Sequence, residues 1–246
     1  NQVLKIACAV PRPWVPDPEF KILEQAREAA TGYSFPSGHT TNAVGTFAAI
    51  ATTEKRCWIR ICCIVLAVLV AFSRMYVGVH TPYDVLAGAG CALFLVIGLK
   101  GFSFREDDNG IKILIGVLLV MATGYLLYMH LGAFPQDTDG TNLASATKNA
   151  YTMIGCSVGV AVVYPLEKKY VNFSTGGSWW IQLIKIVLGL AAVLAVKEGL
   201  KAPLNWLLGA GFGRAVRYFL IVIVAGVLWP MTFRFWNGLG KKRGSL

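Results

Sequence analysis

Long apolar runs, separated by short polar or charged segments, make up most of the chain. Seven of these runs approach the roughly 20 apolar residues that a helix needs to cross a bilayer. The alternation of apolar and polar residues that a membrane β-barrel requires does not occur. The pattern therefore predicts an all-α fold, a polytopic transmembrane helical bundle. The spans are expected at Thr40–Thr53, Cys57–Phe72, Tyr83–Leu99, Ile111–Met129, Ala150–Pro165, Trp179–Val196 and Ala215–Trp236.

The composition agrees with a membrane protein. Of the 246 residues, 55% are hydrophobic and 15% are charged, and the mean hydropathy is +0.56. Soluble domains carry roughly a quarter charged residues. The net charge of +10 would suggest nucleic-acid binding in a soluble protein, but here Lys and Arg fall in short loops between apolar runs. They indicate membrane topology and headgroup contact, so we expect a bilayer and no nucleic acid as partner.

The distribution of cations predicts which side of the membrane each loop faces. Loops rich in Lys and Arg tend to stay in the cytoplasm. This rule places the three polar strings described next on the opposite side, facing a periplasm or the cell exterior. We expect the membrane to be a bacterial inner membrane. The loops assigned to the cytoplasm carry Lys55, Arg56, Lys100, Arg105, Lys112, Lys168, Lys169, Arg234, Lys241, Lys242 and Arg243.

Three polar strings hold the candidate chemistry. They are KIACAVPRP (5–13), YSFPSGH (33–39) and SRMYVGVHTPYD (73–84). Together they supply two imidazoles, a carboxylate next to one of them, and three fixed cations. These groups can move a phosphoryl group without a metal ion, because cations bind the phosphate oxygens while the imidazoles serve as nucleophile and acid.

The second string predicts a helix start that faces an anion. Ser37 is a favourable N-cap, and Gly38 allows a ligand to approach the backbone closely. A helix that starts there directs free N–H groups and the positive end of its dipole toward an anion. His39 is then placed to donate a proton to an oxygen. Taken alone, this string would indicate no more than a turn with a surface histidine.

The second histidine precedes another predicted helix start. Thr81 and Pro82 resemble an N-cap and a first helical residue, which puts Asp84 in the first turn. From there the carboxylate can reach back to His80, fix its tautomer and leave its other nitrogen as a free base, as in a histidine nucleophile. If this motif stood alone, an exposed histidine that caps a helix would be the better interpretation.

Lys5, Arg12 and Arg74 are candidate ligands for phosphate oxygens. Guanidinium groups match such oxygens in bidentate fashion. Arg12 precedes a proline, which disfavours helical geometry, so Arg12 is expected at a span end that faces the aqueous boundary. Each cation taken singly is more often a positional anchor, and the inference depends on their combination.

The strings resemble the signature of the type-2 phosphatidic acid phosphatase superfamily. Its K-x6-R-P, P-S-G-H and S-R-x5-H-x3-D elements occur here in the same order, with every fixed position present. The resemblance covers about residues 5–99. It implies a membrane lipid phosphatase that needs no metal and no cofactor. Its substrate would be a lipid phosphate monoester or diphosphate of the isoprenyl diphosphate, phosphatidylglycerol phosphate, phosphatidate or lipid A type.

The resemblance also implies a role for each matched residue. His80 attacks phosphorus and forms a phosphohistidine, and Asp84 orients His80. His39 protonates the leaving group and then activates water. The phosphoryl oxygens are bound by Lys5, Arg12, Ser37, the Gly38 N–H and Arg74.

We expect residues 1–103 to form the catalytic core and residues 104–246 to add about four transmembrane helices without assigned chemistry. The family places further spans before its first motif, and these are expected upstream of residue 1. Three alternatives remain open. The site could transfer the phosphoryl group to a second lipid or hold vanadate for halide oxidation, and a lipid transporter or binding module could retain it in vestigial form. The intact motifs and the membrane spans favour the phosphatase.

Several features lie outside this scheme. Residues 19–30 form an amphipathic stretch expected along the membrane interface. Arg214 and Arg217 are expected on the same side as the motifs, where they could hold a second phosphate or a lipid headgroup. His130 is expected at the interface, and the acidic run 106–108 in a solvated turn. The six cysteines show no C-x-x-C spacing and are expected to act as small hydrophobic residues.

Overall fold

The computed structural model describes residues 1–100, 108–134, 139–174 and 176–241. Within these ranges every regular element is a helix, which confirms the predicted all-α fold. Six helical segments are long and apolar enough to cross a membrane, and only 6% to 22% of each is buried inside the protein. The other apolar side chains need a bilayer to cover them, so the chain is an integral membrane protein.

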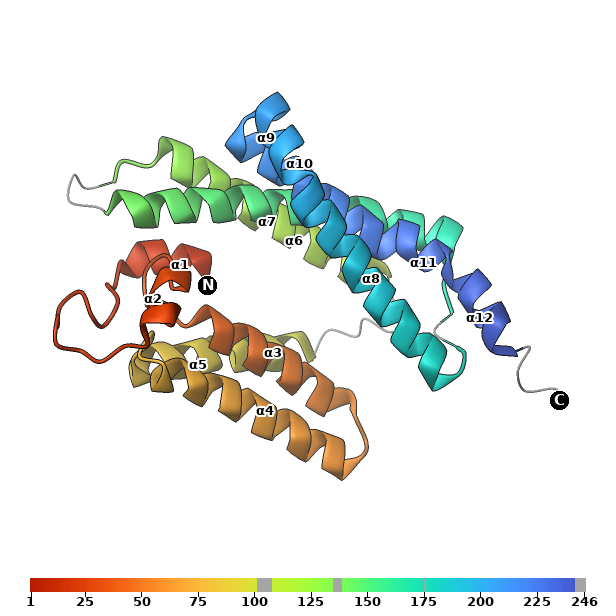
Figure 1. The fold of residues 1–246 in the computed structure, drawn as a ribbon, viewed down its shortest axis with the longest axis horizontal. Helices are drawn as coiled ribbons and strands as arrows, with labels where there is room; N and C mark the ends of the chain where they lie inside the picture. The colour runs from red at the N-terminus through yellow and green to blue at the C-terminus, as the bar shows by residue number, and fades with distance from the viewer. Residues whose placement is uncertain (101–107, 135–138, 175, 242–246) are drawn as a thin grey trace. The chain divides into compact units, whose positions relative to one another are not determined.

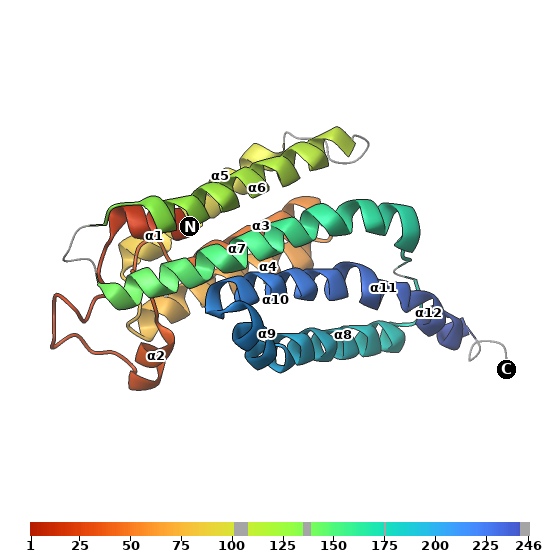
Figure 2. The same ribbon diagram turned by 90° about the horizontal axis from the view of Figure 1, so that it is seen from above.

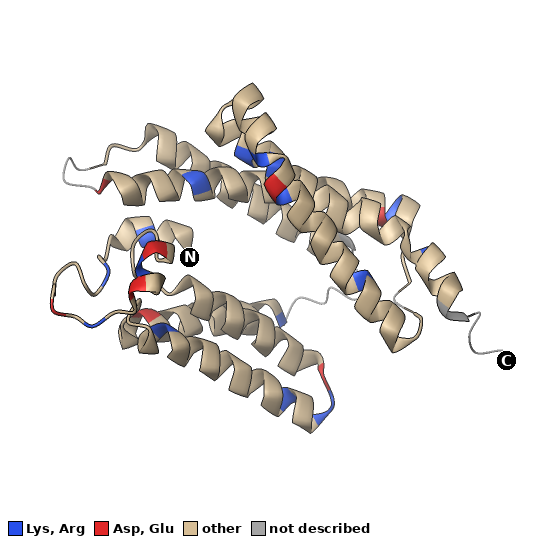
Figure 3. Ribbon diagram, in the orientation of Figure 1, with Lys and Arg blue, Asp and Glu red and all other residues tan. Residues whose placement is uncertain are grey.

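Six of the seven expected spans are found, and the last four are the extra C-terminal spans that the sequence predicted. The remaining one, Thr40–Thr53, forms α3 (Gly38–Thr53), whose 16 residues rise about 24 Å and are too short for a span. Long stretches of the helices carry no charged residue (Figure 3). The six spans are Cys57–Tyr76 (α4), Pro82–Lys100 (α5), Asn109–Leu131 (within α6, Asp108–Leu131), Gly140–Val171 (beginning with α7, Gly140–Leu166), Trp179–Leu208 (beginning with α8, Trp179–Gly199) and Ala210–Met231 (beginning with α10, Ala210–Ile223).

The chain packs as two compact units. The first unit comprises Asn1–Gly110 and Ala133–Ala146, and the second comprises Ile111–Gly132 and Thr147–Leu246. In Figure 1 the helices α1 to α5 of the first unit are coloured red to yellow. The domain boundary that the sequence predicted, between residues 103 and 104, lies outside the described residues, as does most of the acidic run 106–108.

In the first unit, α3 packs against both α4 and α5. Short connections join these helices in sequence, so neighbours run antiparallel, and the first turns of α3 and α5 meet the last turn of α4 at one end. The segment 9–37 lies over this end (Figures 1 and 2). The Ser34 N–H donates to the carbonyl of Val10 at 2.8 Å, and the Leu23 N–H donates to the carbonyl of Val77 at 3.2 Å.

The N-terminal segment contains two short helices, α1 (Gln2–Cys8) and α2 (Glu24–Ala29). The amphipathic stretch 19–30 is thus helical over six residues only. Leu23 has extended backbone angles and bonds to the connection between α4 and α5, so the helix begins only after it. The hydrogen bond that holds Leu23 in an extended conformation therefore makes α2 shorter than the apolar pattern of residues 19–30 predicts.

The second unit is built around α7, α8 and α10. It also contains α9 (Lys201–Leu208), α11 (Trp229–Met231) and α12 (Phe233–Lys241). A π-helical turn follows α7 at Glu167–Val171, and another follows α10 at Val224–Leu228.

Glycines bring α7 into close contact with α10 and with the π-helical turn that follows α10. A Cβ added to Gly155 would lie 2.2 Å from the carbonyl oxygen of Ala215, and one added to Gly226 would lie 2.4 Å from Cγ1 of Val163. These contacts advance in the same direction along both helices, which therefore run parallel. Small residues at such crossings let membrane helices pack where no hydrophobic force from water drives them together.

One close approach ties α5 to the start of α3. A Cβ added to Gly88 would lie 2.7 Å from the carbonyl oxygen of Ser37 and 3.1 Å from Oγ1 of Thr41. Gly88 thus allows the backbone of Ser37 to lie directly on α5. Gly90, on the same helix, has nothing within 4 Å of the equivalent position.

We expect Gly88→Ala to lower the melting temperature of the detergent-purified protein, because the methyl group must displace Ser37. Overpacking of this kind typically costs about 1–3 kcal/mol. Gly90→Ala is the matched control, since it makes the same change on the same helix where there is room. Thermal unfolding followed by tryptophan fluorescence compares them, and equal melting temperatures for the two variants would contradict the close packing.

Candidate active site

The start of α5 is fixed by a reciprocal pair of hydrogen bonds. The Thr81 N–H donates to Oδ2 of Asp84 at 2.7 Å, and the Asp84 N–H donates to Oγ1 of Thr81 at 3.4 Å. Pro82 is the first residue of the helix, where its missing N–H costs no hydrogen bond. The predicted helix start, with Asp84 in its first turn, is therefore confirmed.

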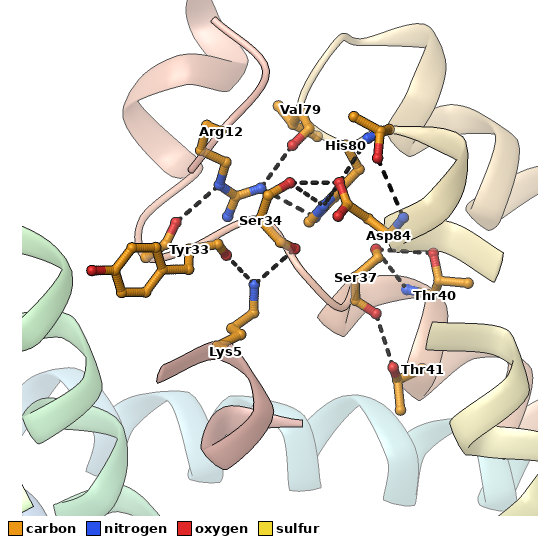
Figure 4. A network of polar contacts seen from close by, with 12 residues as sticks. Lys5, Arg12, Tyr33, Ser34, Ser37, Thr40, Thr41, Val79, His80 and Asp84 are labelled. Carbon is orange, nitrogen blue, oxygen red and sulfur yellow. Dashed lines mark hydrogen bonds and ion pairs between the residues drawn. The ribbon is translucent and has the colours of Figure 1, made fainter. Parts of the chain in front are cut away.

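Asp84 is 1% exposed, and its carboxylate makes two further contacts (Figure 4). The Ser34 hydroxyl donates to Oδ2 of Asp84 at 2.5 Å, and Nδ1 of His80 lies 3.4 Å from the same oxygen. Ser34 Oγ is also 3.3 Å from Nδ1 of His80. An imidazole that faces a carboxylate through Nδ1 carries its proton there, which leaves Nε2 with a free electron pair.

His80 itself is 4% exposed. Its burial lowers its pKa below the usual 6.5, and the charges of Arg12 and Lys5 act in the same direction. The bond to Asp84 opposes this by raising the pKa. His80 is therefore neutral at pH 7. Nη1 of Arg12 lies 3.2 Å from Nε2 of His80, so a guanidinium N–H faces the free electron pair.

The start of α3 is capped by Ser37, as the sequence predicted. Its buried Oγ accepts from the Thr40 N–H at 3.4 Å and from the Thr40 hydroxyl at 2.9 Å. The Ser37 N–H donates to the carbonyl of Asp84 at 2.9 Å, which joins the starts of α3 and α5. Gly38 is the first helical residue, so its backbone N–H belongs to the open end of the helix.

His39 lies in the first turn of α3 and is exposed. Partial desolvation lowers the pKa of His39 below 6.5, and the positive charges of Arg74, Arg12 and Lys5 lower it further, in that order. Cations from the first and third strings thus act on an imidazole of the second. The convergence of the three strings at one end of the helices, which the sequence could only suggest, is present in the structure.

Lys5 and Arg12 are 9% exposed, whereas the sequence placed Arg12 at the aqueous boundary. The ammonium group of Lys5 donates to the carbonyls of Tyr33 and Ser34. Desolvation and the charge of the neighbouring Arg12 lower the pKa of Lys5 to about 8, although the charge of Asp84 acts weakly in the opposite direction.

The guanidinium of Arg12 also donates to backbone carbonyls of the loop that precedes α3. Its Nε donates to the carbonyl of Gly32 at 2.9 Å, its Nη2 to that of Thr31 at 3.0 Å and its Nη1 to that of Val79 at 2.8 Å. Desolvation lowers the pKa of Arg12 to about 10, so it stays charged at pH 7. Both cations therefore hold the loop that carries Ser34 against His80.

Arg74, in the last turn of α4, is half-buried, and its Nε donates to the hydroxyl of Ser73 at 3.2 Å. Sequence reasoning missed two residues of the site, Ser34 and Thr40. Both belong to or follow the YSFPSGH string, but no spacing rule connects Ser34 to a carboxylate 50 residues away. In the described part of the chain, no three His, Cys, Asp or Glu side chains lie together as a metal site would require.

Several curated proteins are similar to parts of this chain. An undecaprenyl-diphosphatase of Sulfolobus acidocaldarius is 49% identical over 59 residues, which is 24% of this chain and 28% of that protein. Phosphatidylglycerophosphatase B of Bacillus subtilis is 38% identical over 29% of this chain and 40% of its own length. Undecaprenyl-diphosphatase BcrC of Bacillus subtilis is 32% identical over 43% of this chain and 51% of its own length. The chain thus spans about half or less of these relatives.

No solved structure matches the chain significantly. Residues 1–108 match the PAP2 superfamily, and residues 151–242 match the transmembrane extension of PAP2 superfamily phosphatases. The first match contains all three strings, and the second runs from within α7 to the end of α12. The first match falls in the first unit and the second match in the second unit. The chain belongs to the PAP2 superfamily.

Proposed function

We propose that the protein is an integral-membrane lipid phosphatase that works through a phosphohistidine on His80 and needs no metal. The observation that carries the proposal is the contact of His80 with Asp84 at Nδ1 and with Arg12 at Nε2, at the helix ends where His39 also lies. The charges of Lys5 and Arg12 act on both imidazoles. A phosphoryl group bound by those cations would lie between a nucleophile and an acid. The PAP2 membership and the phosphatase names of the relatives support the same reaction.

In the first step, the electron pair on Nε2 of His80 attacks phosphorus, and the bond between phosphorus and the leaving oxygen breaks. His39 supplies the proton that the leaving oxygen takes up. The positive charge that develops on the His80 ring is offset by Asp84, which keeps its bond to Nδ1–H. The contact between Arg12 and Nε2 must give way as phosphorus approaches, so Arg12 moves from the imidazole to a phosphoryl oxygen.

In the second step, His39 takes a proton from water, whose oxygen attacks phosphorus. The phosphorus–nitrogen bond breaks, its electron pair returns to Nε2 of His80, and inorganic phosphate is released. Each histidine ends the cycle in the protonation state in which it began.

The phosphoryl oxygens would be held by Lys5, Arg12, Arg74, Ser37 and the Gly38 N–H. Charged donors and a helix start act most strongly where negative charge accumulates on these oxygens. Ser37 Oγ accepts both of its bonds from Thr40, which leaves its own hydrogen for an oxygen of the anion. These fixed cations occupy the role that a metal ion has in other phosphoryl-transfer sites.

We further propose an isoprenyl diphosphate as the substrate class, with the site on the periplasmic or exterior face of a bacterial inner membrane. Two of the relatives described above are named undecaprenyl-diphosphatases. The distribution of Lys and Arg among the loops supports the outward orientation.

We expect His80→Ala to abolish phosphate release from a long-chain isoprenyl diphosphate, while the protein still inserts in the membrane, because no other group can take the phosphoryl. His39→Ala should cost about 10²–10⁴ in kcat for a lipid phosphate monoester, and less for a diphosphate, whose phosphate leaving group needs less help from an acid. His130→Ala removes the third histidine, which bonds to Tyr151 in the second unit, and is the control. Full turnover by His80→Ala would sink the proposal.

The lowered pKa of His39 predicts the pH dependence of kcat/KM. His39 must be protonated to act as the acid, so kcat/KM should fall as pH rises through its pKa in the free enzyme, below 6.5. Arg74→Gln removes the largest of the charges that lower this pKa and should move the fall to higher pH, even though it weakens binding. Arg27→Gln, an exposed cation paired with Glu24, is the control. An unmoved or lowered inflection in Arg74→Gln would contradict the assignment of His39.

A further inference from the structure

The second unit contains a buried cation to which no described residue supplies a counter-charge. Arg217 of α10 is 4% exposed, and its Nε and Nη1 atoms are buried without a hydrogen-bond partner. None of the ion pairs formed by the described residues includes Arg217. An unpaired buried charge is strongly destabilising, so the observation calls for a partner that is not part of the chain.

The position of Arg217 makes this cost larger. The candidate span runs from Ala210 to Met231, and Arg217 lies seven residues into it, about 10 Å along the helix axis. Long basic side chains at such positions normally extend to the aqueous boundary, but this one is enclosed by protein. Ionisable residues inside membrane spans are retained mainly where they bind something.

Arg214 adds a second positive charge beside the first. Its Nε donates to the hydroxyl of Thr152 at 2.8 Å, a neutral partner. The guanidinium carbons of Arg214 and Arg217 lie 5.6 Å and 5.7 Å from the centroid of the same ring, that of Tyr218. Arg214 and Arg217 lie three residues apart on α10, so they occupy neighbouring positions on one side of the helix. Their like charges repel each other there, and an anion near both would stabilise them.

Near the connection between α9 and α10, a buried hydrogen-bond acceptor also lacks a partner, in addition to the donors of Arg217. Gly213 lies one turn before Arg217, on the same face of α10, and a Cβ there would lie 2.4 Å from the carbonyl oxygen of Leu204 in α9. The next residue of α9 is Asn205, whose Oδ1 is buried without a hydrogen-bond partner. A ligand with both a phosphate and a hydroxyl group would satisfy both kinds of atom.

We propose that Arg217, with Arg214, binds the phosphate of an anionic phospholipid headgroup in the second unit, and that Asn205 accepts a hydrogen bond from a headgroup hydroxyl. The binding is non-covalent and uses no residue of the candidate active site. Basic pockets between transmembrane helices are suited to anionic headgroups, because the phosphate lies at the membrane surface while the acyl chains remain in the bilayer. The lipid would be a structural partner that neutralises a charge buried in the extension.

The test counts lipids retained by the full chain. Purified protein is incubated with phosphatidylglycerol, which carries a phosphate and two hydroxyl groups, and bound lipids are counted by native mass spectrometry. We expect Arg217→Gln to retain one phosphatidylglycerol fewer than the wild type. Lys201→Gln, which removes an exposed cation at the start of α9, is the matched control and should retain the wild-type number. An unchanged count in Arg217→Gln would overturn the proposal.

A second measurement covers the case in which a variant is poorly folded. Without lipid, Arg217→Gln should melt at the same or a higher temperature than the wild type, because it removes an unpaired buried charge. Phosphatidylglycerol should raise the melting temperature of the wild type more than that of Arg217→Gln. A lower melting temperature for the lipid-free variant would mean that the chain itself compensates Arg217 and would overturn the proposal.

Two further ligands identify what is recognised. Phosphatidylcholine should produce no Arg217-dependent stabilisation, and an equal effect would overturn recognition of the anionic headgroup. Inorganic phosphate should also fail to reproduce the effect, and equal stabilisation would assign the site to the free anion instead. Neither readout needs turnover, so a protein that binds the lipid but releases no phosphate would overturn only the proposed function.

Discussion

The buried carboxylate of Asp84 is the interaction on which the geometry of the first unit depends. A carboxylate in this position is stable only if hydrogen-bond donors surround it. The donors come from the Ser34 hydroxyl and the Thr81 N–H, and Nδ1 of His80 faces the same oxygen. Segments far apart in the sequence are thus joined at one point. The requirement to satisfy this charge fixes both the start of α5 and the orientation of the imidazole next to it.

Buried cations are treated differently in the two units. In the first unit, Lys5 and Arg12 donate to backbone carbonyls and are attracted by the charge of Asp84, so part of the cost of their burial is offset within the protein. In the second unit, Arg217 has buried donors without partners, and its neighbour Arg214 bonds to a neutral hydroxyl. In the proposed function the first arrangement would serve a substrate that binds and leaves, whereas the second would suit a ligand that stays bound.

Local rules predicted the helix starts correctly because a cap depends on residues within one turn. Ser37 was predicted as an N-cap from its own side chain, and Thr81 and Asp84 are three residues apart, a spacing that is visible in the sequence. Hydropathy likewise predicted the spans, except that it counted Thr40–Thr53. This segment lies in α3, which packs against α4 and α5 and is shorter than a span requires.

Other parts of the site could not have been read from the sequence. Lys5 and Arg12 bond to backbone carbonyls, which every residue carries, so no pattern of side chains marks their partners. The bond from Ser34 to Asp84 depends on how the loop folds over the helix ends. The helix α2 is short because Leu23 is bonded to a distant connection. Each of these features follows from tertiary contacts and not from local preference.

The most direct test of the account is to trap the phosphoryl group on His80. Enzyme mixed with excess labelled lipid diphosphate is quenched in alkali within the first turnovers, digested and mapped by mass spectrometry, because phosphohistidine survives alkali and hydrolyses in acid. The account predicts an acid-labile phosphoryl group on the peptide that contains His80, formed at least as fast as phosphate is released. Steady phosphate release with no phosphoryl group on His80 at any time, or with the label on another residue, would contradict it.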